Sequence, residues 1–193
     1  MAPELKYYSE CDMALAIDTM TDFLIDFGAK EVPHTNKNYF AHAVGVYRDM
    51  RKWQADDEVC RAAMFHSIYG TEGFQTLTLP LNRRDELRDL IGVRAEKLVY
   101  ANCAMQRQAF YCAVADYDDH YRLPDRLTGG WLELTRCDFE DLMRLHLCDF
   151  LELVERTAMW DYERSTMALM SERLGGVMRQ AYLETFAREP QLD

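Results

Sequence analysis

The chain has 193 residues, of which 49% are hydrophobic and 28% are charged, a balance typical of one compact globular domain. Its formal net charge of -11 argues against a nucleic-acid-binding protein, because neutralising phosphates requires a basic surface. No apolar run approaches the roughly 20 residues that span a bilayer, and no basic segment followed by an apolar run marks a secretory signal. We therefore expect a cytoplasmic protein that binds neither nucleic acid nor a membrane.

The cysteines show no Cys-x-x-Cys spacing, which argues against a zinc ribbon or a thioredoxin-type site. Most of them lie in apolar, helix-like stretches and are predicted to be buried free thiols in a reducing compartment. They are Cys11, Cys60, Cys103, Cys112, Cys137 and Cys148.

The first half of the chain has apolar residues at helical spacing in four successive segments. Ser9 resembles an N-cap for the first helix, and Gly28 stands where that helix would stop. Thr35 or Asn36 is placed to cap the second helix, and Asp56 to cap the third. The predicted helices end near Phe27, Trp53, Ile68 and Gly92, with residues 75–81 forming a loop.

The second half continues the helical pattern with one interruption. Gly129-Gly130 between β-prone flanks predicts a small hairpin, and Thr135 is placed to cap the helix that follows. Gly175-Gly176 inside the last helix predicts close packing or a kink. The elements are helices at about 93–116, 136–156 and 162–189, and a hairpin within 127–134. The predicted fold class is all-α, a single domain over 1–193 with at most one small β-hairpin.

One face of the predicted helix 136–156 combines apolar residues with a carboxylate. The residues of this face, at spacings of 3, 4, 3 and 4, are Phe139, Leu142, His146, Asp149 and Leu153. A carboxylate in an apolar stripe requires a partner cation or a metal. An ion pair with an arginine is the alternative. Arg107, in the middle of a predicted helix, is expected to form a surface ion pair, with an anion contact as the alternative.

The stretch Arg61–Phe74 carries the strongest sign of a functional site. It begins as an apolar helix, reaches His66 in its last turn, and continues into a glycine-containing loop. Ser67 and Tyr69 provide hydroxyls and Glu72 a carboxylate, a set that can orient a polar ligand, with Glu72 as a general base. We take these three residues as the catalytic candidates. Capping or pairing at the surface is the alternative for Glu72.

Several motifs resemble the HD-domain superfamily of helical metal-dependent phosphohydrolases. They are Ala-Ala-Met-Phe-His-Ser at 62–67, Gly-Thr-Glu at 70–72 and Ile-Gly-Val-Arg-Ala-Glu-Lys-Leu-Val at 91–99. Their order is similar to that in the hydrolase domain of RelA/SpoT-type enzymes, which degrade guanosine tetraphosphate. The chain also looks similar to an uncharacterised bacterial and fungal HD-like family with a His-Ser-x-Tyr-Gly-Thr motif. The resemblance covers about 34–155 and leaves 157–193 as a C-terminal helical extension.

The resemblance implies metal ligands at His42, His66 and Asp149. Ser67 replaces an aspartate that ligates metal in the family, and a neutral hydroxyl is a weaker ligand for a hard cation. His34, just before the second helix, is the candidate that can compensate with a third imidazole. The implied cofactor is a divalent transition metal: Fe, Mn or Zn.

The leading functional hypothesis is an HD-like metal-dependent hydrolase whose small-molecule substrate is anionic, either phosphorylated or nucleotide-like. Two histidines and one carboxylate also suit a non-haem iron oxygenase. A third hypothesis follows from two departures from the family pattern. Ser67 replaces an aspartate, and Gly70-Thr71 stand where the hydrolases carry an acidic pair. In that hypothesis a degenerate HD-like domain binds a ligand or a partner without catalysis. The sequence leaves open whether the protein forms a homodimer.

Overall fold

The computed structural model describes residues 10–191, so the cap expected at Ser9 lies outside the described part of the chain. The all-α prediction is confirmed. The helices are α1 (Glu10–Asp26), α2 (Tyr39–Lys52), α3 (Asp57–Met64), the short 3-10 helix η1 (Leu81–Arg83), α4 (Arg84–Ile91), α5 (Val93–Ala104), α6 (Arg107–Ala113), α7 (Arg136–Thr157), α8 (Arg164–Leu174) and α9 (Gly176–Phe186).

Two small antiparallel strand pairs accompany the helices. The pair β3 (His120–Pro124) and β4 (Trp131–Thr135) is the hairpin expected around Gly129-Gly130, although its first strand lies before the predicted segment. The structure adds a second pair of two residues each, β1 (Pro33–His34) and β2 (Lys37–Asn38). That pair connects α1 to α2 and carries His34.

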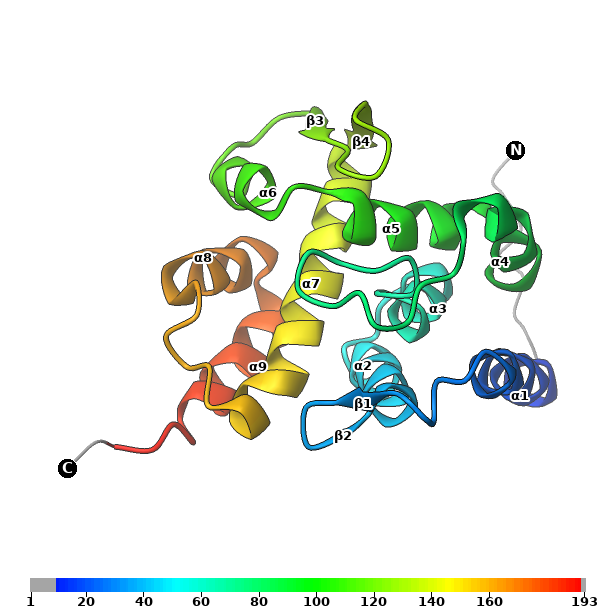
Figure 1. Ribbon diagram of the computed structural model, residues 1–193. Helices are drawn as coiled ribbons and strands as arrows, with labels where there is room; N and C mark the ends of the chain where they lie inside the picture. The colour runs from blue at the N-terminus through cyan, green and yellow to red at the C-terminus, as the bar shows by residue number, and fades with distance from the viewer. Residues whose placement is uncertain (1–9, 192–193) are drawn as a thin grey trace.

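The long helix α7 runs through the middle of the molecule and organises the other helices (Figure 1). Helices α2, α3 and α5 pack against it, and so do α8 and α9. The core where they meet is built from fully buried side chains that include Phe65, Phe110 and Phe139. Because α7 contacts both groups of helices, a polar side chain on α7 can face residues that are distant in sequence.

Helix α2 begins later than the sequence pattern predicts. Its N-cap is Asn38, whose side chain accepts a hydrogen bond from the Ala41 amide at 2.8 Å, rather than Thr35 or Asn36. The β1–β2 pair places the latter two in its turn, where Thr35 has a φ of 42°. His42 lies among the buried residues of α2, rather than beside its buried face as the sequence pattern predicts.

Helix α3 ends at Met64 instead of continuing to Ile68. A series of turns follows, in which the Ile68 amide donates to the Phe65 carbonyl at 2.9 Å and the Gly70 amide to Ser67 at 2.9 Å. His66 therefore lies in the first turn beyond the helix, where the backbone carbonyls of α3 have lost their helical partners.

The predicted helix 93–116 is divided into α5 and α6. Met105 takes an extended conformation, with φ −62° and ψ 142°, and forms an isolated bridge with Asp125. The Gln106 amide donates to the Pro124 carbonyl at 3.1 Å. The β3–β4 hairpin thus takes backbone hydrogen bonds that a continuous helix would use, and α6 starts in a new direction at Arg107.

The C-terminal region is also two helices rather than one. Gly175 separates α8 from α9 with φ 63° and ψ −161°, so the expected kink is a complete break. Close packing is not its cause, because a Cβ added at Gly175 would meet no atom within 4 Å. The prediction for α7 is confirmed: Thr135 caps it by accepting from the Asp138 amide at 3.2 Å.

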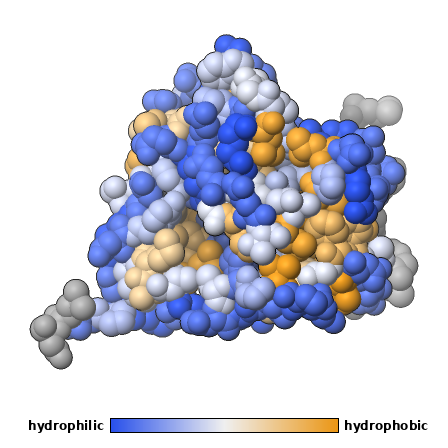
Figure 2. All heavy atoms as spheres, in the orientation of Figure 1, coloured by the Kyte–Doolittle hydropathy of each residue, from blue (hydrophilic) through white to orange (hydrophobic). Residues whose placement is uncertain are grey.

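Figure 2 shows hydrophilic residues over much of one face, with hydrophobic residues visible in its central part. None of the helices in residues 10–191 is long and apolar enough to cross a bilayer. Cys60, Cys103 and Cys148 are buried free thiols, as expected, whereas Cys112 and Cys137 are exposed.

Candidate metal centre

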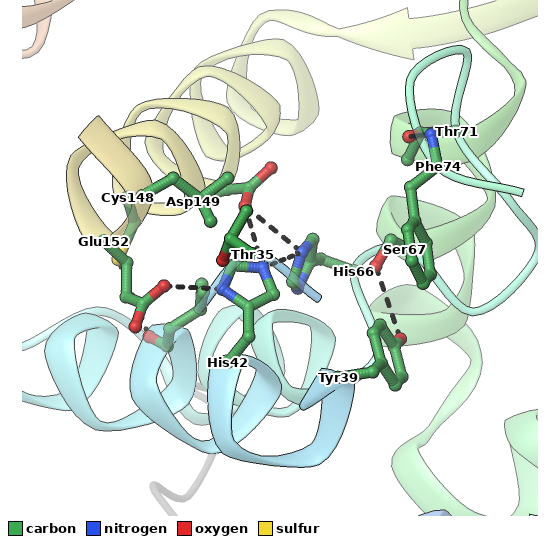
Figure 3. A network of polar contacts seen from close by, with 12 residues as sticks. Thr35, Tyr39, His42, His66, Ser67, Thr71, Phe74, Cys148, Asp149 and Glu152 are labelled. Atoms are coloured by element: carbon green, nitrogen blue, oxygen red, sulfur yellow. Dashed lines mark hydrogen bonds and ion pairs between the residues drawn. The ribbon is translucent and has the colours of Figure 1, made fainter. Parts of the chain in front are cut away.

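Three side chains from separate elements meet at one buried point (Figure 3). His42 comes from α2, His66 from the turn after α3, and Asp149 from α7. The two imidazole Nε2 atoms lie 3.2 Å apart. Asp149 Oδ1 lies 3.1 Å from Nε2 of His42 and 3.4 Å from Nε2 of His66. The arrangement can hold a metal ion, and these are the three positions that the family resemblance implies.

The outer nitrogen of each histidine is fixed by an acceptor. His42 Nδ1 lies 2.6 Å from Glu152 Oε2, and His66 Nδ1 lies 2.9 Å from the Ala63 carbonyl oxygen. A carboxylate and a carbonyl only accept hydrogen bonds, so each Nδ1 carries the proton. In both neutral imidazoles, Nε2 then bears a lone pair directed into the centre. Two lone pairs and the Asp149 oxygen therefore face one another.

Such a group is stable only when a positive charge lies between its members. In the metal-free protein a proton supplies it: burial disfavours the charged form of His42, but Asp149 and Glu152 outweigh burial and raise its pKa to about 9. Burial opposes ionisation of Asp149 as well, but the neighbouring imidazoles of His66 and His42 hold its pKa well below the usual range. A divalent cation can replace this proton, because imidazole and carboxylate together are ligands for Zn, Fe and other transition metals.

The partners that orient the two histidines were not identified from the sequence. Glu152 is held in place by Lys37, at 2.9 Å, and by Arg156. Its place three residues after Asp149, on the same side of α7, is the signal that would have found it. His66 is held in place by Asn102, whose side-chain amide donates to the His66 carbonyl oxygen at 2.8 Å. Such outer contacts commonly set the orientation and basicity of a ligating imidazole.

His34 lies beside the centre. Its ring stacks on that of His42, with centroids 4.3 Å apart and planes at 12°, and it contacts Phe74 edge-on. Burial, followed by the charge on His42, lowers the pKa of His34 to about 4, so its imidazole is neutral near pH 7. The ligand atoms of His42, His66 and Asp149 lie within 4.8 Å of one another, and His34 is not part of this cluster.

The three catalytic candidates have different surroundings. Ser67 lines the cavity over the centre and is 3.3 Å from the Tyr39 hydroxyl, to which it donates. Glu72 lies at the exposed rim, where its carboxylate accepts from the Arg107 amide at 3.1 Å. Tyr69 is not brought to this cavity: its hydroxyl donates to the buried Glu96 at 2.9 Å.

The cavity over the centre has a volume of about 550 Å³. The residues that line it include the three candidate ligands, Arg107 and His146. Apolar and aromatic side chains from β1, the loop after α3, α7, the segment before α8 and α8 itself form much of the remainder. They are Pro33, Phe74, Phe150, Leu153, Met159, Tyr162 and Met167.

Comparison with known proteins gives one match. A family model described as a domain of unknown function, DUF6817, matches residues 23–107, less than half of the chain. The matched segment contains His42 and His66 and ends before α7, which carries Asp149. No curated protein and no solved structure matches the chain.

Proposed function

We propose that this protein is a metal-dependent enzyme in which His42, His66 and Asp149 bind one divalent transition metal: Fe, Mn or Zn. The observation that carries the proposal is the set of three electron-pair donors facing one another while Glu152 and Ala63 fix the outer imidazole nitrogens. The HD-domain resemblance supports the same three positions. We propose hydrolysis of a small anionic molecule as the reaction.

A metal held by three protein ligands retains open positions, lowers the pKa of a bound water towards neutrality and polarises a substrate oxygen. The chain supplies the rest of the site. Among the residues that line the cavity, Glu72 is the carboxylate outside the ligand set, and its exposed position at the rim suits a general base. Ser67 offers a buried hydroxyl beside His66, and apolar side chains form much of the cavity wall.

An oxygenase is the second candidate, and the composition of the ligand set favours it. Two histidines and one carboxylate with open positions are typical of non-haem Fe(II) oxygenases. The two activities differ in their co-substrate, which is molecular oxygen for the oxygenase and water for the hydrolase. Oxygen consumption by the Fe(II)-loaded protein with an organic substrate would support the oxygenase, whereas anaerobic turnover with water would support the hydrolase.

Elemental analysis of the purified protein tests the metal centre directly. After expression in medium supplemented with Fe, Mn and Zn, we expect close to one metal ion per chain. His42→Ala and Asp149→Asn are expected to lose most of it. His120→Ala is the matched control, because His120 is exposed on β3 and outside the centre.

The absence of metal from the folded wild-type protein would overturn the enzyme proposal. A domain that binds a ligand or partner without catalysis would then be the better description. In that case the histidine substitutions would change thermal stability and leave no metal content to lose.

A further inference from the structure

The cavity continues from the candidate metal centre along α7, towards the C-terminal end of that helix. Asp149, Leu153 and Thr157 follow one another at intervals of four residues, so they lie on one face of α7, and all three line the cavity. At a rise of about 1.5 Å per residue, this face extends about 12 Å beyond Asp149. We call this part of the cavity the apolar arm. The side chains that line it are Phe150, Leu153, Thr157, Met159, Tyr162 and Met167.

The segment that joins α7 to α8 forms part of the wall of the apolar arm. It leaves the C-terminal end of α7 and turns back towards α8, which packs against α7 (Figure 1). Ala158 and Glu163, at the two ends of the segment, have φ values of 53° and 44°, in the left-handed region that residues with a Cβ seldom adopt. Trp160 anchors the segment, because it is buried and packs edge-on against Phe186. The segment is therefore held in place by its backbone turns and by this anchor.

Two large side chains of this segment line the cavity and are nevertheless exposed to solvent. Met159 is 43% exposed and Tyr162 is 37% exposed. Apolar surface in contact with water costs free energy in proportion to its area. A ligand in the apolar arm would cover part of this surface, and its binding would be favoured for that reason.

The hydroxyl groups in the apolar arm already have partners. Thr157 Oγ1 donates to the Leu153 carbonyl oxygen at 3.0 Å. The Tyr162 hydroxyl lies 3.2 Å from the Tyr111 hydroxyl. The other side chains of the arm are apolar: Phe150, Leu153, Met159 and Met167. A polar ligand group placed here would lose its hydrogen bonds to water without equivalent replacements, so the arm suits an apolar group.

The charges around the cavity disfavour a polyphosphate ligand. Among the described residues that line it, Arg107 is the one lysine or arginine, and its Nη1 already faces His146 Nε2 at 3.4 Å. Glu72 and Asp149 add carboxylates to the lining. The several charges of a nucleoside diphosphate need several cations to compensate them. A ligand with a single anionic group needs only the metal ion.

We propose that the apolar arm binds the alkyl or aryl group of a small-molecule substrate whose single anionic group lies at the metal centre. The cavity volume of about 550 Å³ is in the range of pockets that enclose small organic molecules. The arm is a binding site by itself, and calling its occupant a substrate rests on the proposed function. The inference narrows the small anionic molecule proposed above to one with an apolar body.

Calorimetric titration of the Zn-loaded full chain with two hydroxamates tests the apolar arm. Acetohydroxamate and hexanohydroxamate share the group that chelates zinc, and the second has a longer alkyl chain. Each methylene group that becomes buried strengthens binding by about fourfold. We expect hexanohydroxamate to bind at least about tenfold more tightly than acetohydroxamate. Equal affinities for the two compounds would overturn the proposal.

Substitution of Met159 assigns the alkyl chain to the apolar arm. Met159→Ser is expected to reduce the ratio of the two hydroxamate affinities at least about threefold and to leave the affinity for acetohydroxamate unchanged. Leu169→Ser is the matched control, because Leu169 is 41% exposed on α8 and does not line the cavity. An affinity ratio in Met159→Ser equal to that of the wild type would place the chain elsewhere and overturn the proposal.

Nuclear magnetic resonance of protein labelled with carbon-13 in the methionine methyl groups tests the arm without metal and without a variant. Addition of hexan-1-ol to the metal-free protein should shift the methyl signals of Met159 and Met167, which line the arm. The signal of Met50, which is buried outside the cavity, should not move. Ethanol at the same concentration should cause smaller shifts, because its alkyl chain is shorter. Signals of Met159 and Met167 that do not respond to hexan-1-ol would overturn the proposal.

A comparison of two phosphates tests the class of substrate. Hexyl phosphate has one phosphate group on an apolar body, whereas adenosine diphosphate has two phosphates on a polar body. We expect the Zn-loaded protein to bind hexyl phosphate at least about tenfold more tightly, measured by displacement of hexanohydroxamate. Tighter binding of adenosine diphosphate would overturn the proposed substrate class.

The outcomes for the apolar arm and for the metal centre are distinguishable. Shifts of the Met159 and Met167 signals with hexan-1-ol, in a protein that never takes up metal, would sustain the arm and overturn the proposed enzyme. Stoichiometric metal with equal affinities for the two hydroxamates would sustain the metal centre and overturn the arm.

Discussion

At the scale of single residues, the protonation of His42 controls the candidate centre. Its Nδ1–H is committed to Glu152, so its Nε2 can hold either a proton or a metal, never both. The same constraint applies to His66, whose Nδ1–H is committed to the Ala63 carbonyl. A metal that binds at this centre would therefore have to displace the proton from Nε2 of His42.

The first residue-scale prediction concerns pH and metal affinity. Since the pKa of His42 is about 9, metal binding below that pH must displace a proton. We expect the apparent affinity for Zn to rise about tenfold per pH unit from pH 7 and to level off near pH 9. Competition with a chromophoric chelator measures it. A pH-independent affinity over this range would contradict the proton-bridged form.

The stability of the metal-free protein should fall with rising pH over the range in which the metal affinity rises. The folded-state pKa of His42 is raised above its ordinary value of 6.5, so its contribution is complete below about pH 6.5 and is lost as the pH rises through about 9. The lowered pKa values of His34 and His146, about 4 and about 3, instead remove stability as the pH falls below 6.5. We expect urea unfolding to show maximum stability near pH 6.5, with Zn abolishing the alkaline loss.

The third residue-scale prediction concerns Glu152. Glu152→Gln retains an oxygen that accepts from His42 Nδ1–H but removes the negative charge that makes the imidazole more basic. We expect about a tenfold loss of metal affinity with little loss of fold, measured by the same chelator competition above pH 9, where no proton on His42 competes with the metal. Glu155→Gln, at an exposed position of α7, should bind metal like the wild type. Equal affinities of the two variants would show that Glu152 has no such role.

At the scale of elements, local backbone chemistry sets where the helices begin and end. Asn38 and Thr135 start α2 and α7 by accepting from backbone amides, and these two helices carry His42 and Asp149. Gly175 ends α8 in a conformation that is open almost only to glycine. The positions of His42 and Asp149 along their helices therefore depend on capping residues outside the site.

The element-scale prediction concerns Gly175. Gly175→Ala should destabilise the protein by about 1–3 kcal/mol, because φ 63° with ψ −161° is strained for a residue with a Cβ. The strain is in the backbone, since the added methyl group meets no neighbour within 4 Å. Gly73→Ala is the control: it also meets no neighbour, and its φ is not in the positive range. Urea unfolding measures the stability of both variants. Similar losses of stability in Gly175→Ala and Gly73→Ala would contradict backbone strain at Gly175.

At the scale of the whole molecule, the candidate centre joins three parts of the chain. A bound ion would link His42 on α2, His66 beyond α3 and Asp149 on α7, and α7 also contacts α8 and α9. A ligand that binds only the folded state stabilises it in proportion to the logarithm of its concentration. Metal should therefore stabilise the fold as well as the site.

The whole-molecule prediction concerns thermal unfolding. With free metal about 100-fold above its dissociation constant, the gain is about 2.7 kcal/mol, which raises the Tm by about 5–10 °C for a chain of this size. Differential scanning calorimetry with and without Zn measures the shift. Asp149→Asn should lose most of it, and His120→Ala should retain it. An equal shift in Asp149→Asn would place the bound metal elsewhere.

The sequence by itself determined the features that depend on neighbours along the chain. The spacing of Phe139, His146 and Asp149 defined one face of α7, and Thr135 marked its start, because helix periodicity and capping are local. The motif around His66, read through the family resemblance, also placed His42 and Asp149 in one set, and the structure brings these three together.

Only the tertiary structure decided which groups complete the site. His42 and Glu152 are separated by 110 positions, so packing of α2 on α7, not spacing, makes them partners. The break at Met105 arises because the β3–β4 hairpin competes for its backbone, and that break directs Arg107 to the cavity. Tyr69, by contrast, turns away to Glu96. Residue type and spacing name the groups able to act, whereas contacts between distant segments fix where each group points, because those contacts form only when the core closes.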